Sequence, residues 1–142
     1  MIYTDLTKKA LKLCFKVHKK QVDKTGVPYV FHPYHVAEEM DNETAVVCAL
    51  LHDAISEESD YTLLKNDGFT DEIIQTLKVL NHREDVPFFD YIKAIAKNPI
   101  AKQVKISDLK HNADLSRLGE PDEATLKRVV KYKKAIKFLK EN

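Results

Sequence analysis

Two histidines and two aspartates lie outside the apolar patterns that surround them: His32, His52, Asp53 and Asp108. His52 and Asp53 follow the apolar run "AVVCALL", and Asp108 follows "VKIS". A buried carboxylate without a partner is costly, so an aspartate in such a setting needs a base or a metal ion. Two imidazoles and two carboxylates would ligate and neutralise one divalent cation such as Mn, Fe, Co or Zn. For the His52-Asp53 pair alone, a hydrogen bond between the two side chains explains the sequence equally well.

The elements that must position these side chains are helices, because apolar residues recur at helical spacing along the chain. Asn42 is expected to cap a helix in which His52 and Asp53 lie mid-helix. Asp108 is expected inside a helix over residues 99–118, which begins at a proline. The other expected helices cover residues 6–17, 33–40, 62–66, 70–80, 88–98 and 121–142, between breaks at glycine and proline.

The composition predicts one all-α domain over residues 1–142, a single compact bundle of several helices. A chain of 142 residues with 44% hydrophobic and 32% charged residues is typical of a globular domain with its own core. No segment alternates at period two between turn signals, which excludes a sheet protein. The net charge of +1 gives no general attraction to nucleic acid or to membranes. We therefore expect neither as a partner.

The cysteines and the N-terminus predict a cytoplasmic protein. Cys14 and Cys48 lie among apolar neighbours without CxxC spacing, so we expect two small buried side chains in a reducing compartment. The N-terminus has no signal-peptide core, and no apolar run is long enough to span a membrane. The lysine-rich C-terminal segment is interpreted as a solvated helix face. The sequence neither indicates nor excludes an oligomer.

Three segments in order, "GVPYVFHPYHVAEEM", "ALLHDAISE" and "AKQVKISDLKHN", resemble the HD-domain hydrolases. The resemblance is strongest to the small (p)ppGpp hydrolases of the RelA/SpoT and Mesh1 group, and it runs from about His18 to Arg117. It implies an all-helical domain that holds one divalent metal ion, commonly Mn²⁺. The positions matching the family's metal ligands are His32, His52, Asp53 and Asp108, and Asn112 matches a family asparagine four residues beyond the last aspartate.

The resemblance implies hydrolysis of a phosphate ester or anhydride in a nucleotide, and the residues can support this chemistry. A bound metal ion activates water and polarises a phosphoryl oxygen, while nearby cations stabilise charge on the phosphate. Lys102 and Lys105 match basic positions of the family, and Lys16 lies near another. For Lys102 a solvated role is about as plausible. His82, Arg83, Tyr29 and Tyr91 are further candidates for lining a cleft, with ordinary surface or core roles as the alternative.

The residues after His52-Asp53 depart from the family. The (p)ppGpp hydrolases usually place Glu-Asp where this chain has Ser56 and Glu57. On a continuous helix Glu57 would share a face with Asp53, four residues earlier, so we assign it as the general acid/base with Glu58 as second choice. Ser56 would lie over His52. The alternative is a pair of solvent-facing glutamates.

Three functions remain open on the sequence. The favoured one is hydrolysis of the 3′-pyrophosphate of ppGpp, or of a close nucleotide relative. The departure at Ser56 leaves open an HD phosphatase acting on a nucleoside monophosphate or on NADPH. It also leaves open a module that binds a nucleotide without turnover. The chain is too short for the synthetase domain of the long relatives.

Overall fold

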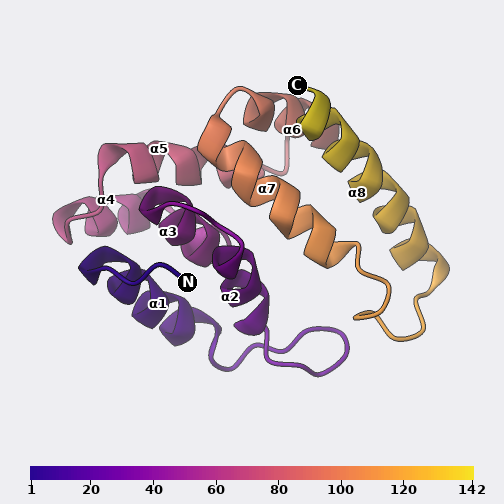
Figure 1. Cartoon of the computed structure of the whole chain (residues 1–142), viewed down its shortest axis with the longest axis horizontal. Coiled ribbons are helices and arrows are strands. Elements are labelled where there is room, and N and C mark those ends of the chain that lie inside the picture. Colours follow the sequence, from indigo (N-terminus) through magenta and orange to yellow (C-terminus); the bar gives the residue numbers. More distant parts are fainter.

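Eight helices account for all the regular secondary structure of this chain in the computed structural model, which describes residues 1–142 (Figure 1). The helices are α1 (Asp5–His18), α2 (Phe31–Glu38), α3 (Glu43–Leu51), α4 (Glu58–Asn66), α5 (Asp71–Leu80), α6 (Phe88–Ala96), α7 (Pro99–Asn112) and α8 (Glu123–Glu141). Outside them, a single isolated bridge joins Val22 and Pro28. The predicted all-α bundle is confirmed.

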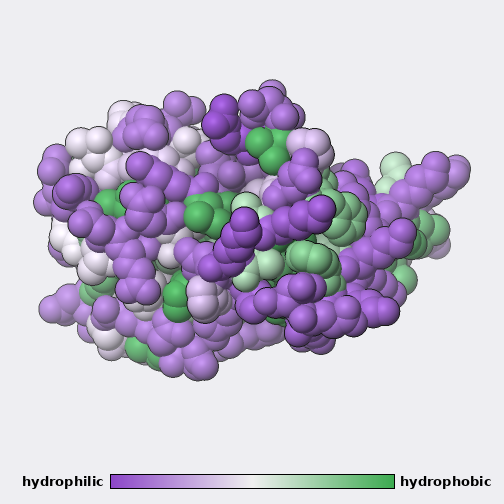
Figure 2. Space-filling view, turned by 90° about the horizontal axis from the view of Figure 1, so that it is seen from above, coloured by the Kyte–Doolittle hydropathy of each residue, from purple (hydrophilic) through white to green (hydrophobic).

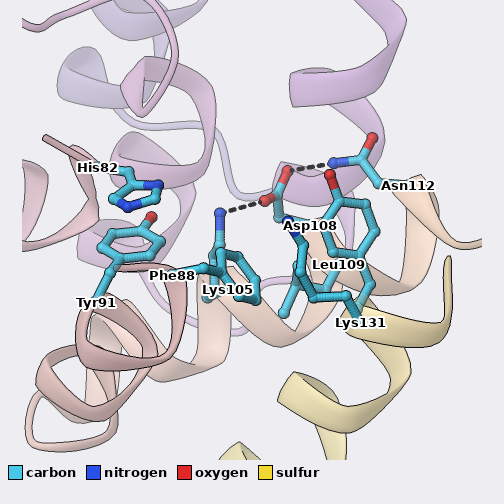
Figure 3. A pocket seen from close by; sticks show the side chains of 9 residues that line it. His82, Phe88, Tyr91, Lys105, Asp108, Leu109, Asn112 and Lys131 are labelled. Atoms are coloured by element: carbon cyan, nitrogen blue, oxygen red, sulfur yellow. Dashed lines mark hydrogen bonds and ion pairs between the residues drawn. The ribbon is translucent and has the colours of Figure 1, made fainter. Parts of the chain in front are cut away.

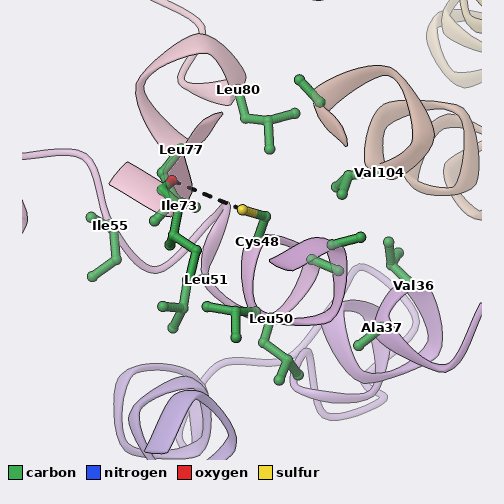
Figure 4. Packing of buried hydrophobic residues seen from close by; sticks show 14 of the residues in the cluster. Val36, Ala37, Cys48, Leu50, Leu51, Ile55, Ile73, Leu77, Leu80 and Val104 are labelled. Atoms are coloured by element: carbon green, nitrogen blue, oxygen red, sulfur yellow. Dashed lines mark hydrogen bonds between the residues drawn. The ribbon is translucent and has the colours of Figure 1, made fainter. Parts of the chain in front are cut away.

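Helix α3 is the centre of the core. Every residue from Ala45 to Leu51 is at most 1% exposed, so this helix is apolar on all sides. It packs against α1, α2, α5 and α7, and Figure 4 shows Leu50 and Leu51 pointing to different neighbours. A helix enclosed in this way has little freedom to shift, which fixes the position of the residues that follow it.

Helix α7 lies beside α3 and connects the two parts of the bundle. It packs against α2 and α3 on one side and against α6 and α8 on the other, as Figure 1 shows. Side-chain caps fix where both central helices begin. Asn42 accepts a hydrogen bond from the backbone N–H of Ala45 at 2.8 Å, and Asn98 accepts one from Ala101 at 3.0 Å. The register of α3 and α7 is thereby set.

Several helix ends differ from the sequence prediction, and two of the differences bear on the site. Helix α3 stops at Leu51, so His52 and Asp53 lie in the turn after it and not mid-helix. The His52 ring bonds the carbonyl of Ala49 at 2.7 Å, and Ala54 N–H donates to the carbonyl of Leu51 at 3.0 Å, which closes a tight turn.

Helix α7 likewise stops at Asn112 and does not reach residue 118. Asp114 accepts hydrogen bonds from the backbone and side chain of Ser116, a local turn that competes with the helix. The chain then reverses into α8. Hydrophilic residues dominate the face seen in Figure 2, with apolar side chains lying among them. None of the eight helices combines the length and apolar character needed to cross a bilayer.

Candidate metal centre

The structure brings together the four side chains that the sequence singles out. His32 comes from α2, His52 and Asp53 from the turn after α3, and Asp108 from α7. One donor atom from each lies within 4.8 Å of the others. Asp108 Oδ1 is 2.7 Å from His32 Nε2 and 3.3 Å from His52 Nε2, and His52 Nε2 is 3.2 Å from Asp53 Oδ2. Three separated segments thus meet at one point.

The geometry fits a single divalent cation. Metal–nitrogen and metal–oxygen bonds of about 2.0–2.2 Å put the donors around one ion roughly 3–4 Å apart. The four donors lie between 2.7 Å and 4.8 Å from one another, so they need only small shifts to surround an ion. His32, His52 and Asp108 are 4–6% exposed, whereas the Asp53 side chain is 40% exposed. The cluster is therefore closed on most sides and open at Asp53, as a site that admits a substrate must be.

Neighbouring groups orient both imidazoles with Nε2 toward the cluster. His52 uses Nδ1 to donate to the carbonyl of Ala49 at 2.7 Å, so Nε2 faces the aspartates and can offer its lone pair to an ion once its proton is displaced. His32 places Nδ1 2.6 Å from Nδ1 of His111, and the two rings stack with centroids 4.9 Å apart. Such outer partners fix the tautomer that a metal ion requires.

The carboxylates are held in the same manner. The Tyr29 hydroxyl donates to Asp53 Oδ2. Lys105 Nζ donates to Asp108 Oδ2 at 2.9 Å, and Asn112 Nδ2 donates to Asp108 Oδ1 at 3.3 Å. Lys105 and Asn112 lie three residues before and four residues after Asp108, so one helix face supplies both partners.

Charge at the cluster favours a cation. Burial alone would lower the pKa of His52, but the charge of Asp53 and the contacts with Asp108 outweigh it and raise that pKa to about 10. Burial would raise the pKa of Asp53, yet His52 holds it at about 2. The pKa of Asp108 is likewise well below its usual value, because Lys105 and the two histidines overcome the effect of burial. The protonated His52 thus balances part of the negative charge of the two carboxylates, and a bound divalent cation would take the place of that proton.

Two cavities adjoin the cluster from different sides. The smaller, of about 230 Å³, is bounded by α6, α7 and α8 and the residues before α6 (Figure 3). The larger, of about 630 Å³, lies between the segment before α2 and the segment that joins α7 to α8. Asp108 lines the smaller cavity, His32 lines the larger one, and Asn112 and Tyr132 line both. A substrate that reaches the cluster therefore has room on both sides.

Of the three lysines expected to bind substrate, only Lys105 lies at the site. Lys105 lines the smaller cavity together with His82 and Tyr91. Lys16 is exposed on α1, and Lys102 is partly buried on α7, and neither lines either of these two cavities. Their proposed contact with substrate has no support from the geometry.

Contrary to the sequence prediction, Glu57 does not share a helix face with Asp53. The helix that would carry both residues ends at Leu51. Glu57 caps the start of α4 instead, and its backbone N–H donates to Asp60 Oδ2 at 3.3 Å. Ser56, Glu57 and Glu58 are all exposed, and none belongs to the four-residue cluster. Ser56 therefore does not lie over His52 on a common helix.

Sequence reasoning missed the contribution of the C-terminal region to the site. Lys131 and Tyr132 of α8 line the smaller cavity, and Arg117 and Arg128 line the larger one. The sequence pattern predicts a solvated face for the lysine-rich segment, and this prediction does not distinguish Lys131 as a residue of the site. A usable signal was the half-buried Tyr132 next to it, an aromatic residue inside a basic stretch.

The comparisons with known proteins agree with the resemblance in the sequence. No family model matches the chain. The chain is 27% identical over 136 residues to a probable GTP pyrophosphokinase of Mycobacterium leprae (strain TN), which covers 86% of this chain and 17% of that protein. It is 42% identical over 57 residues to a GTP pyrophosphokinase of Myxococcus xanthus, which covers 37% of this chain and 8% of that protein. The chain thus spans under a fifth of either relative.

The fold has a solved counterpart over nearly the whole chain. It is the structure of a metazoan ortholog of SpoT that hydrolyses ppGpp and plays a role in starvation responses. The TM-score is 0.70 at 17% sequence identity, with 98% of this chain and 96% of that chain covered. The resemblance to the RelA/SpoT group is thus confirmed at the level of the fold.

Proposed function

We propose that this chain is a metal-dependent phosphohydrolase that cleaves the 3′-pyrophosphate from ppGpp or a close nucleotide relative. The observation that carries the proposal is the four-donor cluster, open at Asp53 and flanked by two cavities. The relatives named as GTP pyrophosphokinases and the ppGpp-hydrolysing ortholog of SpoT support the substrate class. The partner is accordingly a small nucleotide.

The proposed metal ligands are His32, His52, Asp53 and Asp108, and the proposed ion is Mn²⁺. Carboxylate and imidazole donors without sulfur suit Mn²⁺, and the two carboxylates balance its charge. When bound, such an ion supplies an activated water and stabilises charge on phosphoryl oxygens.

Other residues of the chain position the proposed ligands, and a carboxylate would transfer the proton. Lys105 and Asn112 hold the Asp108 carboxylate in place, and Tyr29 does the same for Asp53. In the proposed reaction the oxygen of water adds to the phosphorus attached to the ribose 3′ oxygen, and the bond between that phosphorus and the 3′ oxygen breaks. A carboxylate accepts one proton from water and passes a proton to the departing oxygen. The products are GDP and pyrophosphate.

Glu57 is the proposed proton carrier, with Glu58 as the alternative. Both belong to the segment that leaves the cluster at Asp53, and both are exposed to solvent. Neither is one of the four donors, so each would act on the reacting water without holding the ion.

A second candidate function is an HD phosphatase acting on a nucleoside monophosphate or on NADPH. Ser56, which stands where the ppGpp hydrolases usually carry glutamate, favours it. The buried cysteines Cys14 and Cys48, which are not paired with each other, agree with the reducing conditions of the cytoplasm for either function.

A screen for release of phosphate or pyrophosphate tests the proposed function. The chain, loaded with Mn²⁺, is incubated separately with ppGpp, NADPH and nucleoside monophosphates. We expect the highest kcat/KM with ppGpp, with equal amounts of GDP and pyrophosphate formed. Turnover of NADPH or a monophosphate alone would favour the second function. Binding of nucleotides without turnover of any of them would identify a non-enzymatic module.

A further inference from the structure

The two cavities beside the cluster differ in charge and size. This difference indicates which end of a bound substrate lies in which cavity. We propose, given the proposed function, that the smaller cavity is the subsite for the phosphoryl or pyrophosphoryl group that water attacks and that is released as phosphate or pyrophosphate, and that Lys131 contacts this group. The nucleoside part of the substrate then occupies the larger cavity.

The smaller cavity is basic. Lys105 from α7 and Lys131 from α8 both line it, as Figure 3 shows, and its only carboxylate is Asp108. Both oxygens of Asp108 are already engaged, Oδ1 by the two histidines and Asn112 and Oδ2 by Lys105. No other acidic group in this cavity would repel an anion.

Lys131 is poised to receive an anion. Its Nζ lies 4.5 Å from the ring centre of Phe88 and 5.7 Å from that of Tyr132, and it forms no ion pair with any carboxylate. A cation held over aromatic rings keeps its hydrogen-bond donors available and is partly desolvated. Such a group gains more from an incoming phosphate than a fully solvated lysine does.

The larger cavity has no such excess of positive charge. Three basic residues line it, and three acidic residues oppose them, so its formal charge is balanced. The basic residues are Lys24, Arg117 and Arg128, and the acidic residues are Asp23, Glu120 and Asp122. A free phosphate or pyrophosphate therefore gains less net attraction there than in the smaller cavity. The GDP part of the substrate finds donors and acceptors for its base and ribose, and the basic residues are available for its 5′-diphosphate.

Size supports the same orientation. Sites for drug-sized molecules occupy about 300–1,000 Å³, a range that includes the larger cavity of about 630 Å³ and excludes the smaller one of about 230 Å³. The smaller cavity therefore suits a compact group such as phosphate or pyrophosphate. Asn112 and Tyr132 line both cavities and so lie where the two meet. The bond between phosphorus and the ribose 3′ oxygen would lie at this boundary.

The test is the binding of inorganic pyrophosphate and of inorganic phosphate to the Mn²⁺-loaded chain, measured by calorimetric titration. Lys131→Met should weaken binding about tenfold or more, because it removes a charge-assisted hydrogen bond. Lys134→Met is the matched control, since Lys134 is exposed on the same helix and lines neither cavity. If pyrophosphate binds more tightly than phosphate, the group released in this cavity is a diphosphate, and if the two bind equally it is a single phosphate.

Arg128→Met in the larger cavity provides the reciprocal control. It should weaken binding of GDP and leave the binding of pyrophosphate unchanged. Melting curves check folding, and Lys131→Gln serves as a second variant if Lys131→Met is unstable. The proposal is overturned if both Lys131 variants bind pyrophosphate and phosphate as the parent does, or if Arg128→Met weakens pyrophosphate binding equally.

The outcomes separate this proposal from the proposed function. Pyrophosphate binding that depends on Lys131, in a chain that hydrolyses no nucleotide, would support the subsite and contradict the hydrolase. Hydrolysis of ppGpp without any dependence of pyrophosphate binding on Lys131 would support the hydrolase and contradict the subsite.

Discussion

Asp108 is the residue on which the site converges. It is 4% exposed. Its two carboxylate oxygens make hydrogen-bond contacts with Lys105, Asn112 and both histidines of the cluster. Removing one partner of such a buried charged group leaves the others uncompensated. Asp53 differs from it, because its side chain is 40% exposed, and as a proposed ligand it would be the one next to which water and substrate enter.

The Asp53→Ala variant tests the metal assignment at this scale. The parent chain prepared with Mn²⁺ should contain about one ion per chain, and Asp53→Ala should lose most of it. Elemental analysis after desalting measures the content. Asp90→Ala, an exposed acidic residue of α6, is the control and should retain the ion. Equal metal content in parent and Asp53→Ala would contradict the assignment.

Glu57→Gln tests the proton carrier. The variant should keep its metal ion but lose about 10²–10⁴-fold in kcat, the usual effect of removing a general acid or base. Glu58→Gln, next to it and equally without a partner in the cluster, should keep its rate. Steady-state kinetics with ppGpp gives both values. An unchanged kcat for Glu57→Gln with a loss in Glu58→Gln would transfer the role to Glu58.

At the scale of elements, helix α3 sets the site, because its buried position fixes the turn that holds His52 and Asp53. Periodicity predicted where the helices lie, since apolar spacing reports the face that a helix buries. The same periodicity did not predict that α3 ends before His52 or that α7 ends at Asn112. There the helix ends depend on hydrogen bonds of His52 and Asp114, which apolar spacing does not record.

Leu50→Ala should lower the free energy of unfolding by about 2–5 kcal/mol, because Leu50 is 1% exposed and its truncation leaves a cavity in α3. Leu63→Ala is the matched control on α4, where Leu63 is 66% exposed, and it should change stability by less than about 0.5 kcal/mol. Urea unfolding followed by circular dichroism measures both. Equal effects of the two substitutions would contradict the packing described for α3.

At the scale of the whole molecule, the candidate metal centre joins parts of the chain that are distant in sequence. The ordered motifs predicted the four residues of the cluster, because the resemblance supplied their grouping. The role of α8 was not predictable in this way. Its contact with α7 depends on how the chain reverses after Asn112. Apart from the neighbouring Tyr132, Lys131 has no feature in the sequence that separates it from the solvated lysines around it.

A cation held by α2, α7 and the turn after α3 should also stabilise the folded chain. At a free Mn²⁺ concentration of 100 times Kd, binding adds about 2.7 kcal/mol, which raises Tm by roughly 5–10 °C for a chain of this size. Thermal unfolding with Mn²⁺ and with EDTA measures the shift. Asp53→Ala should melt at the same temperature in both. A shift of equal size in that variant would mean that the ion acts elsewhere.

The most direct test of the central claim is an anomalous difference map from crystals of the chain grown with Mn²⁺ and measured at the manganese absorption edge. The account predicts one strong peak per chain, about 2.0–2.3 Å from Nε2 of His32 and His52 and from an oxygen of Asp53 and of Asp108. A strong peak at another place, or no peak among these four side chains, would contradict it.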